Sequence, residues 1–243
     1  MGSGCRYRKV KILALTTATA RCSVVVVDGD QELARGGYDD EMRHAERLFG
    51  VVDEVLAAAK IQREDIEAIA CDVGPGSFTG VRVGLASAKG MALGLQIPLI
   101  GVCGLAAMVE AARQTRPEGV IVPVTDGKRG ELFFAAYDAH GAEVLSPRSL
   151  RAEQFRDALA EFGQDVVLCG DVLDTLDDLS HRRVEADGTA LPDAADIARL
   201  ALRQMAAGGV VPLADVEPVY ARAPDAIPQG APGHGTRGGR AKS

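Results

Sequence analysis

Short apolar runs and stretches with helical spacing follow one another along the first half of the chain. Residues 10–15 and 22–27 are apolar runs, and the second is too rich in β-branched residues to favour a helix. A turn signal stands at 28–30, and 31–37 can return as a third strand. The pattern therefore predicts a chain that opens with a hairpin and an adjoining strand.

Helical spacing begins after this strand. Within 43–59 the apolar residues fall at helical positions, namely Leu48, Val51, Val52, Val55, Leu56 and Ala59. Residues 67–73 are predicted as a buried strand that ends at a Gly-Pro-Gly loop, and 79–95 as a second helix. A strand at 98–102 and a helix at 104–113 complete the first half.

The second half begins after a predicted boundary between lobes at 114–119, which holds Pro117 and Gly119. Beyond it the pattern predicts three strands and two helices. The strands are 120–125, 131–137 and 166–169, and the helices are 152–162 and 192–207, the last with Pro192 near its first turn.

Two lobes and a tail follow from these elements. We predict a first lobe at 9–113 and a second at 114–223, with the helix 192–207 able to pack back on the first lobe. From 224 to 243 the chain is Gly, Pro and Arg with almost no apolar content, so this tail is predicted to be disordered. The imperfectly repeated order of strands and helices indicates a two-lobed α/β protein.

Composition and charge limit the function classes. Hydrophobic residues make up 47% of the chain and aromatic residues only 4%, so few rings are available to stack on unpaired bases. The net charge is −7, and because residues 1–11 carry +4 and 221–243 carry +3, the body at 12–220 carries −14. An acidic body repels phosphate backbones, so we expect the chain not to grip a nucleic acid by itself.

The cysteines favour a reducing compartment. Five of them are widely spaced and form no Cys-x-x-Cys pair, and Cys22, Cys71 and Cys169 lie in or beside apolar runs. This favours small buried side chains over disulfides or a zinc site. The chain begins without an apolar signal core and holds no apolar run of membrane-spanning length, so we predict a cytoplasmic protein without a membrane contact.

The Gly-rich loop and the turn after the first strand are candidate phosphate sites. Thr16, Thr17, Gly74 and Gly76 are weak candidates for binding a nucleotide, because such turns can bring backbone N–H groups to a phosphate. No Lys follows the loop directly, and the acidic residue nearest to the first turn along the chain is Asp28. A magnesium-dependent phosphoryl transferase without a carboxylate in this turn would lack a central part.

The second helix is rich in small residues, which include Gly80, Gly84 and Gly94 with Ala88 and Ala92 between them. A helical Gly costs about 1 kcal/mol relative to Ala, so several in one helix need a reason. Close helix–helix approach is the simplest one. It is equally well explained by packing against the helix at 43–59 and by packing across a subunit interface.

Two further motifs carry little chemistry. His44 and Glu46 form a His-x-Glu pair, but residues two apart do not share a helix face and no further metal ligands accompany them. Ser77 lies in no Gly-x-Ser-x-Gly elbow, and no catalytic triad or metal-ligand set supports a peptidase.

Taken together, five segments in this order resemble the TsaB (YeaZ) family. They are ILALTT at 12–17, HAERL at 44–48, GPGSFTGVRVG at 74–84, DGKRGELF at 126–133 and EPVYAR at 217–222. The resemblance runs from about residue 12 to about residue 223, and the Gly-rich segment is the most specific part. One departure is Thr16, which stands where the family usually has an Asp.

The resemblance implies an α/β fold with two actin-like, Hsp70-type (ASKHA) lobes, mixed sheets and flanking helices. It implies a non-catalytic subunit without a cofactor or metal, which dimerises with TsaD while TsaD transfers threonylcarbamoyl to the tRNA adenosine next to the anticodon. TsaE, an ATPase, and TsaC, which makes threonylcarbamoyl-adenylate, complete the pathway. The tRNA would be met only indirectly.

In this family the two helices that follow the His-x-Glu and Gly-Pro-Gly segments meet TsaD, and they can also form a homodimer. The resemblance therefore predicts an interface made by His44, Arg47, Leu48, Val51, Phe78, Arg82, Val83, Gly84, Ser87 and Met91. On this hypothesis Gly84→Arg abolishes pairing and leaves the monomer folded. The alternative function is an actin-like-fold ATPase or small-molecule kinase that uses the two phosphate-site candidates.

Overall fold

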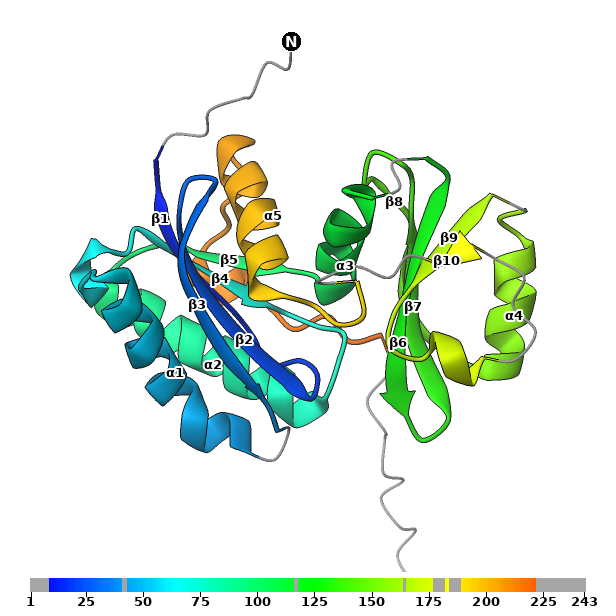
Figure 1. The fold of residues 1–243 in the computed structure, drawn as a ribbon, viewed down its shortest axis with the longest axis horizontal. Coiled ribbons are helices and arrows are strands. Elements are labelled where there is room, and N and C mark those ends of the chain that lie inside the picture. The colour runs from blue at the N-terminus through cyan, green and yellow to red at the C-terminus, as the bar shows by residue number, and fades with distance from the viewer. Residues whose placement is uncertain are drawn as a thin grey trace, which may run out of the picture.

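The protein is described by a computed structural model that covers residues 9–40, 43–115, 118–163, 165–176, 182–183 and 189–221. In this part of the chain, two five-stranded sheets lie side by side and helices pack on their faces (Figure 1). The predicted tail at 224–243 lies outside the described residues. No helix within the described ranges is long and apolar enough to cross a membrane.

The first sheet has the strand order β3-β2-β1-β4-β5. Its first three strands form an antiparallel meander, and β4 and β5 run parallel to β1. The centre of the sheet is apolar on both faces, as strands covered on both sides require. The strands are β1 (Lys11–Thr16), β2 (Arg21–Asp28), β3 (Gln31–Asp39), β4 (Ala68–Asp72) and β5 (Leu99–Val102).

Helices cover both faces of this sheet. On one face α1 (His44–Ala59) and α2 (Phe78–Leu95) pack on Leu13 and Leu15 of β1. On the other face α5 (Ala194–Ala206) packs on the alternate residues of the same strand, which include Ile12. Short 3₁₀ turns, η2 (Arg63–Asp65), η3 (Leu173–Thr175) and η4 (Leu213–Asp215), connect other elements.

The second sheet has the strand order β10-β9-β6-β7-β8 and two covering helices. α4 (Ala152–Ala160) packs on one face through Phe155, and α3 (Gly104–Arg113) packs on the other through Leu105 and Met108. The strands are β6 (Val120–Lys128), β7 (Glu131–Tyr137), β8 (Glu143–Arg151), β9 (Val166–Cys169) and β10 (Arg182–Arg183).

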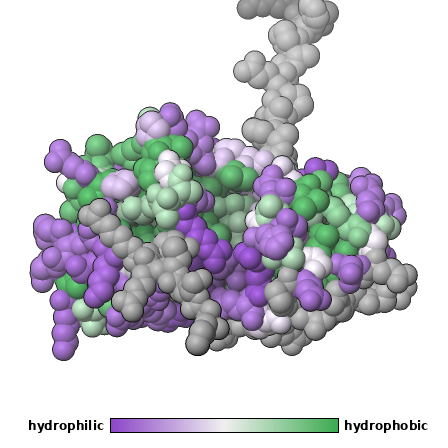
Figure 2. All heavy atoms as spheres, turned by 90° about the horizontal axis from the view of Figure 1, so that it is seen from above, coloured by the Kyte–Doolittle hydropathy of each residue, from purple (hydrophilic) through white to green (hydrophobic). Residues whose placement is uncertain are grey.

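The lobes exchange helices. α3 belongs to the first half of the chain but covers the second sheet, and α5 belongs to the second half but covers the first sheet. The two helices lie next to each other between the sheets (Figure 1). Seen from above, hydrophilic residues gather along the seam between the lobes (Figure 2). A boundary at 113/114 therefore divides the sheets but not the helices that cover them.

Most predicted elements are present with ends shifted by one or two residues, but β8 was missed. Its burial alternates between exposed and partly buried positions, and it contains Pro147. Proline is tolerated there because β8 is an edge strand, where one row of backbone groups forms no ladder bond. β10, which is only two residues long, was also missed.

Candidate partner interface

The turn after β1 is buried and its hydroxyls are already bonded. The side chain of Thr16 is fully buried and donates to Asp72 Oδ2 at 2.7 Å, and Thr17 Oγ1 donates to the Gly80 carbonyl at 2.7 Å. The sequence predicted that no carboxylate lies beside this turn, and this prediction was wrong because the folded chain places one there. Asp72, at the end of β4, supplies one from 56 residues away.

Asp72 joins three segments of the first lobe. Oδ1 accepts the Gly74 N–H at 2.8 Å, and the carboxylate also accepts the Gly104 N–H at the start of α3. Burial raises the pKa of Asp72 to about 6, although the hydrogen bonds from Thr16, Gly74 and Gly104 oppose the rise. Because the carboxylate is only 1% exposed and bonded on both oxygens, it holds the turn together and offers little to a ligand.

The Gly-Pro-Gly loop packs tightly on its own chain. A Cβ on Gly76 would overlap the Ala18 carbonyl, and a Cβ on Gly74 would lie 3.0 Å from the Val219 carbonyl. The Ser77 N–H donates to the Ala18 carbonyl at 2.7 Å. These glycines therefore allow close backbone packing. The four candidate nucleotide-binding residues lie close together, but they pack against other residues of the same chain.

A small hollow of about 50 Å³ lies beside this loop, between the lobes. Asp126 and Asp171 line it together with Gly76, Ser77 and Thr125. Burial raises the pKa of Asp171, and the nearby charge of Asp126 adds to the rise. Lys128 also lines the hollow and its Nζ lies 3.3 Å from Asp126 Oδ2, so one of the two carboxylates is already paired. Within the described residues, no three His, Cys, Asp or Glu side chains are grouped so that they could hold a metal ion.

Ser77 and the first glycines of α2 have structural roles. The Ser77 side chain caps α2 by accepting the Gly80 N–H. A Cβ on Gly80 would overlap the Thr17 carbonyl, and a Cβ on Gly84 would overlap Thr17 Oγ1. The close approach predicted from these small residues is therefore made to the turn after β1, and not to another helix.

His44 is also internal. Its ring is only 2% exposed, with Nε2 2.9 Å from the Thr19 carbonyl and Nδ1 3.2 Å from the Tyr38 hydroxyl. It ties the start of α1 to β3 and to the first turn. Both ring nitrogens of His44 thus have partners within the chain.

Four of the ten predicted interface residues lie inside the monomer, namely His44, Leu48, Val51 and Gly84. Their burial in the monomer does not support the prediction that they contact a partner, because helical periodicity marks the face that packs on the helix's own sheet. The other six lie at the surface or are partly exposed: Arg47, Phe78, Arg82, Val83, Ser87 and Met91. These six belong to the outer sides of α1 and α2.

An apolar groove runs between α1 and α2 on this outer side. It encloses about 210 Å³ and is lined by Leu13, Phe49, Val52, Leu56, Arg63, Ile66, Met91, Gly94 and Leu95. A shallower hollow adjoins it and shares Phe49 and Met91. Phe49 is 48% exposed and Leu93 is 70% exposed. Sequence reasoning missed both because they fall outside the apolar stripe.

Gly90 and Gly94 differ from the other glycines of α2. A Cβ at either position would meet no atom within 4 Å. Each Gly costs about 1 kcal/mol relative to Ala in a helix interior, and packing within the monomer gives no reason for it. Gly94 lines the groove and Gly90 lines its adjoining hollow, so no side chain projects from α2 at these two positions.

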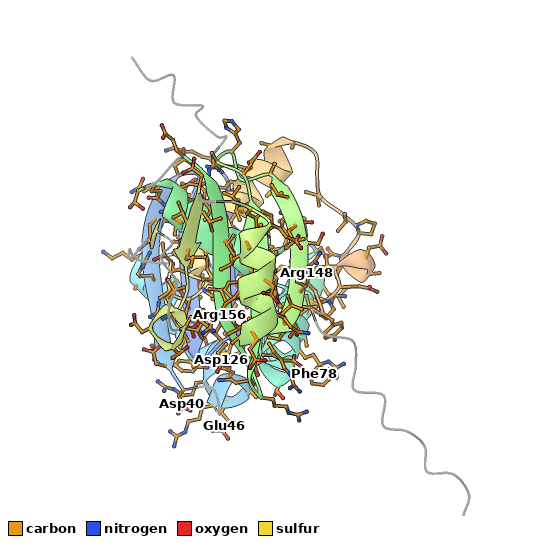
Figure 3. All side chains as sticks on the ribbon, turned by 90° about the vertical axis from the view of Figure 1, so that its right-hand side faces the viewer. Asp40, Glu46, Phe78, Asp126, Arg148 and Arg156 are labelled. Atoms are coloured by element: carbon orange, nitrogen blue, oxygen red, sulfur yellow. The ribbon has the colours of Figure 1, made fainter. Side chains whose placement is uncertain are left out.

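The starts of α1 and α2 and the end of β6 lie at one end of the molecule (Figure 3). Glu46 in the first turn of α1, Phe78 at the start of α2 and Asp126 at the end of β6 all lie at the lower end in the side view (Figure 3). Ser77 lines the hollow between the lobes, and Phe78, the next residue, begins α2.

Comparison with known proteins agrees with this arrangement. Residues 40–198 match the sequence family described as TsaD, tRNA N6-adenosine threonylcarbamoyltransferase. The chain is 32% identical to the tRNA threonylcarbamoyladenosine biosynthesis protein TsaB of Escherichia coli, over 88% of this chain and 95% of the relative.

Solved structures with a similar fold include members of the same family. YeaZ from Pseudomonas aeruginosa superimposes with a TM-score of 0.75 at 29% identity, over 87% of this chain and 99% of that chain. An activator of 2-hydroxyisocaproyl-CoA dehydratase from Clostridium difficile shares the fold alone, with a TM-score of 0.55 at 10% identity over 82% of this chain and 97% of the other. The predicted two-lobed actin-like fold is confirmed. The chain belongs to the TsaB (YeaZ) family of tRNA threonylcarbamoyladenosine biosynthesis proteins, which is related in sequence to TsaD.

Proposed function

We propose that this chain is a non-catalytic subunit that pairs with a TsaD-like protein through the outer face of α1 and α2. In this role it supports the transfer of threonylcarbamoyl to the tRNA adenosine next to the anticodon. The observation that carries the proposal is the apolar groove between the two helices, which the exposed Phe49 lines. Family membership supplies the reaction and the class of partner.

The exposed face has the character of a protein interface. Among the described residues, seven large hydrophobic side chains are exposed, and Phe49, Phe78 and Leu93 belong to α1 and α2. Aromatic side chains seated beside apolar hollows commonly dominate binding energy at such interfaces. Gly90 and Gly94 leave room for a partner helix to come close.

The proposal of a non-catalytic role draws support from the first turn and the Gly-Pro-Gly loop. Their hydroxyls and amides bind Asp72, Ala18 and Gly80 within the chain. A nucleotide would have to break this packing to reach them. The ATPase or kinase alternative is therefore not favoured.

Other parts of the proposal concern the assembly. We infer that a TsaE-like ATPase joins the pair, that the same helix face forms a homodimer when the chain is alone, and that tRNA contacts the partner. The acidic body at 12–220, with a charge of −14, supports an indirect role toward RNA. A protein of tRNA modification is expected to work in the cytoplasm.

The experiment is reconstitution with the TsaD-like protein of the same organism. Purified chain and partner are mixed, and complex formation is followed by calorimetry and by light scattering. Threonylcarbamoylated tRNA is measured with TsaC- and TsaE-like proteins present. We expect a heterodimer and a loss of tRNA product when this chain is left out. Full activity without the chain, or ATP turnover by the chain alone, contradicts the proposal.

A further inference from the structure

Arg82, Phe78 and Tyr220 form an exposed cluster at the head of α2. Arg82 Nε and Nη2 each lie 3.3 Å from the Tyr220 hydroxyl oxygen, so this oxygen accepts from both. The guanidinium carbon of Arg82 lies 3.6 Å from the centre of the Phe78 ring. Phe78 and Tyr220 nevertheless remain 58% and 48% exposed.

The C-terminal segment fixes Tyr220 in this place. Val216 is buried in the core of the first lobe at 4% exposure, and the Val219 N–H donates to the Val73 carbonyl at 2.7 Å. These two anchors hold the segment against the end of β4. Tyr220 is therefore presented from a fixed backbone, although it lies 138 residues from Arg82 in the chain.

The cluster fixes the orientation of the Arg82 guanidinium and leaves its Nη1 without a hydrogen bond to a described residue. Stacking on Phe78 and the bonds to Tyr220 restrict the rotamers of Arg82. Among the described residues, no carboxylate lies within ion-pair distance of Arg82, and Nη1 makes no hydrogen bond. The Tyr220 hydroxyl proton is likewise not donated to any described residue. An N–H and an O–H donor thus face the solvent side by side.

The geometry points to a carboxylate as the group that fills this cluster: an Asp or Glu side chain of the TsaD-like partner, with Arg82 as the contact residue and Tyr220 as its positioning residue. This inference rests on the proposed function. One carboxylate can accept from both donors, and a planar guanidinium is suited to such a pair. The cluster continues the exposed stripe of α2, because Phe78, Arg82, Ala86 and Gly90 follow at four-residue intervals.

A protein carboxylate fits better than an RNA phosphate. The segment that delivers Tyr220 carries exposed Asp215 and Glu217, and the body of the chain has a charge of −14. RNA binding draws on many cations along a backbone, whereas this cluster offers a single one. A desolvated Arg–carboxylate pair one turn before the hollow that Ala86 and Gly90 line would instead fix the register of a docking partner.

The test compares three variants with wild type for binding to the TsaD-like protein, by calorimetry over a range of salt concentrations. Arg82→Gln removes the charge, Tyr220→Phe removes only the hydroxyl, and Arg156→Ala is the matched control, an exposed Arg on α4 of the other lobe (Figure 3). We expect Arg82→Gln to weaken binding about 30-fold and to flatten its salt dependence, and Tyr220→Phe to weaken binding about 5-fold. Arg156→Ala is expected to match wild type.

Thermal melting checks that each variant is folded, which the exposed positions of Arg82 and Tyr220 favour. If wild type does not bind the partner, the proposed function fails. If wild type binds and Arg82→Gln binds within twofold of it, only the present inference fails. The inference is also overturned if Arg82→Gln leaves partner binding unchanged but removes binding to isolated tRNA. Recovery of the Arg82→Glu variant by an Asp→Arg or Glu→Arg change in the partner would identify the carboxylate.

Discussion

Arg203 of α5 grips Glu110 of α3 with two hydrogen bonds, Nη1 to Oε2 at 2.6 Å and Nη2 to Oε1 at 2.7 Å. Glu110 is only 6% exposed, and Arg113 approaches the same carboxylate at 3.5 Å. Each helix covers the sheet of the other half of the chain. The pair therefore joins the two lobes at the seam between them.

Arg203→Ala should destabilise the whole molecule. It leaves the buried Glu110 carboxylate with only the longer contact to Arg113, and because the Arg203 side chain is 44% exposed the loss should be about 1 to 2 kcal/mol. Urea unfolding followed by circular dichroism measures the loss. The double variant Arg203→Met with Glu110→Leu should be more stable than Arg203→Ala, because no buried charge remains. A loss below about 0.5 kcal/mol for Arg203→Ala would contradict this role of the pair.

Gly84→Ala should lower the stability of the monomer by about 2 kcal/mol, because the new Cβ overlaps Thr17 Oγ1. This replaces the expectation that Gly84→Arg leaves the monomer folded. Adding Thr17→Ala should restore part of the loss by removing the hydroxyl. Gly94→Ala is the control and should stabilise by about 0.5 kcal/mol, since nothing lies near its Cβ. Thermal melting of these three variants and of wild type decides, and equal melting points for Gly84→Ala and Gly94→Ala would refute the assignment.

Gly90 should separate stability from pairing. Gly90→Leu is expected to raise the melting temperature of the isolated chain slightly, because Leu is a better helix former and its Cβ would have no atom within 4 Å. The same change should weaken binding to the TsaD-like partner at least tenfold, since it fills the hollow beside Phe49. Calorimetry measures the binding, with Glu153→Leu on α4 as a control. Unaltered affinity for Gly90→Leu would place the interface elsewhere.

Asp196 in the first turn of α5 should make stability depend on pH. Burial raises its pKa to about 7, with further rises from Asp193 and Glu110 and an opposing effect from Arg199. Because folding raises this pKa above its ordinary value, the protonated form favours the folded state, and that stability is lost as the pH rises from about 4 through 7.

Asp196→Asn tests this dependence. Between pH 5 and pH 8 its stability relative to wild type should rise by on the order of 1 kcal/mol, as wild type loses the proton. Denaturant unfolding at each pH gives the difference between the two proteins, in which other titrating groups cancel. A difference that stays constant from pH 5 to 8 would rule out the titration of Asp196 in this range.

The fold was readable from the sequence because each central strand is a continuous apolar run and each helix has one apolar stripe. β8 escaped because an edge strand with polar residues and Pro147 carries neither signal. The exchange of α3 and α5 was only half foreseen. An amphipathic stripe shows that a helix packs, but not which sheet it covers.

The site was less predictable than the fold. Apolar periodicity selected Leu48 and Val51 for the interface, although this pattern marks the core side of α1. The contacts that define the surface, such as Arg82 with Tyr220, join residues far apart in the chain. Likewise the carboxylate next to Thr16 comes from Asp72, because the parallel pairing of β1 and β4 brings their ends together.

The exchange of α3 and α5 between the lobes also determines whether a shortened chain can fold. A fragment that ends after α3 would present the apolar side of that helix, with Leu105 and Met108, to water, and its sheet would lack the cover that α5 provides. The remaining fragment would have the complementary defect. Neither half is then an independent folding unit, and a backbone cut at 116–117 should leave two pieces that stay associated and unfold together.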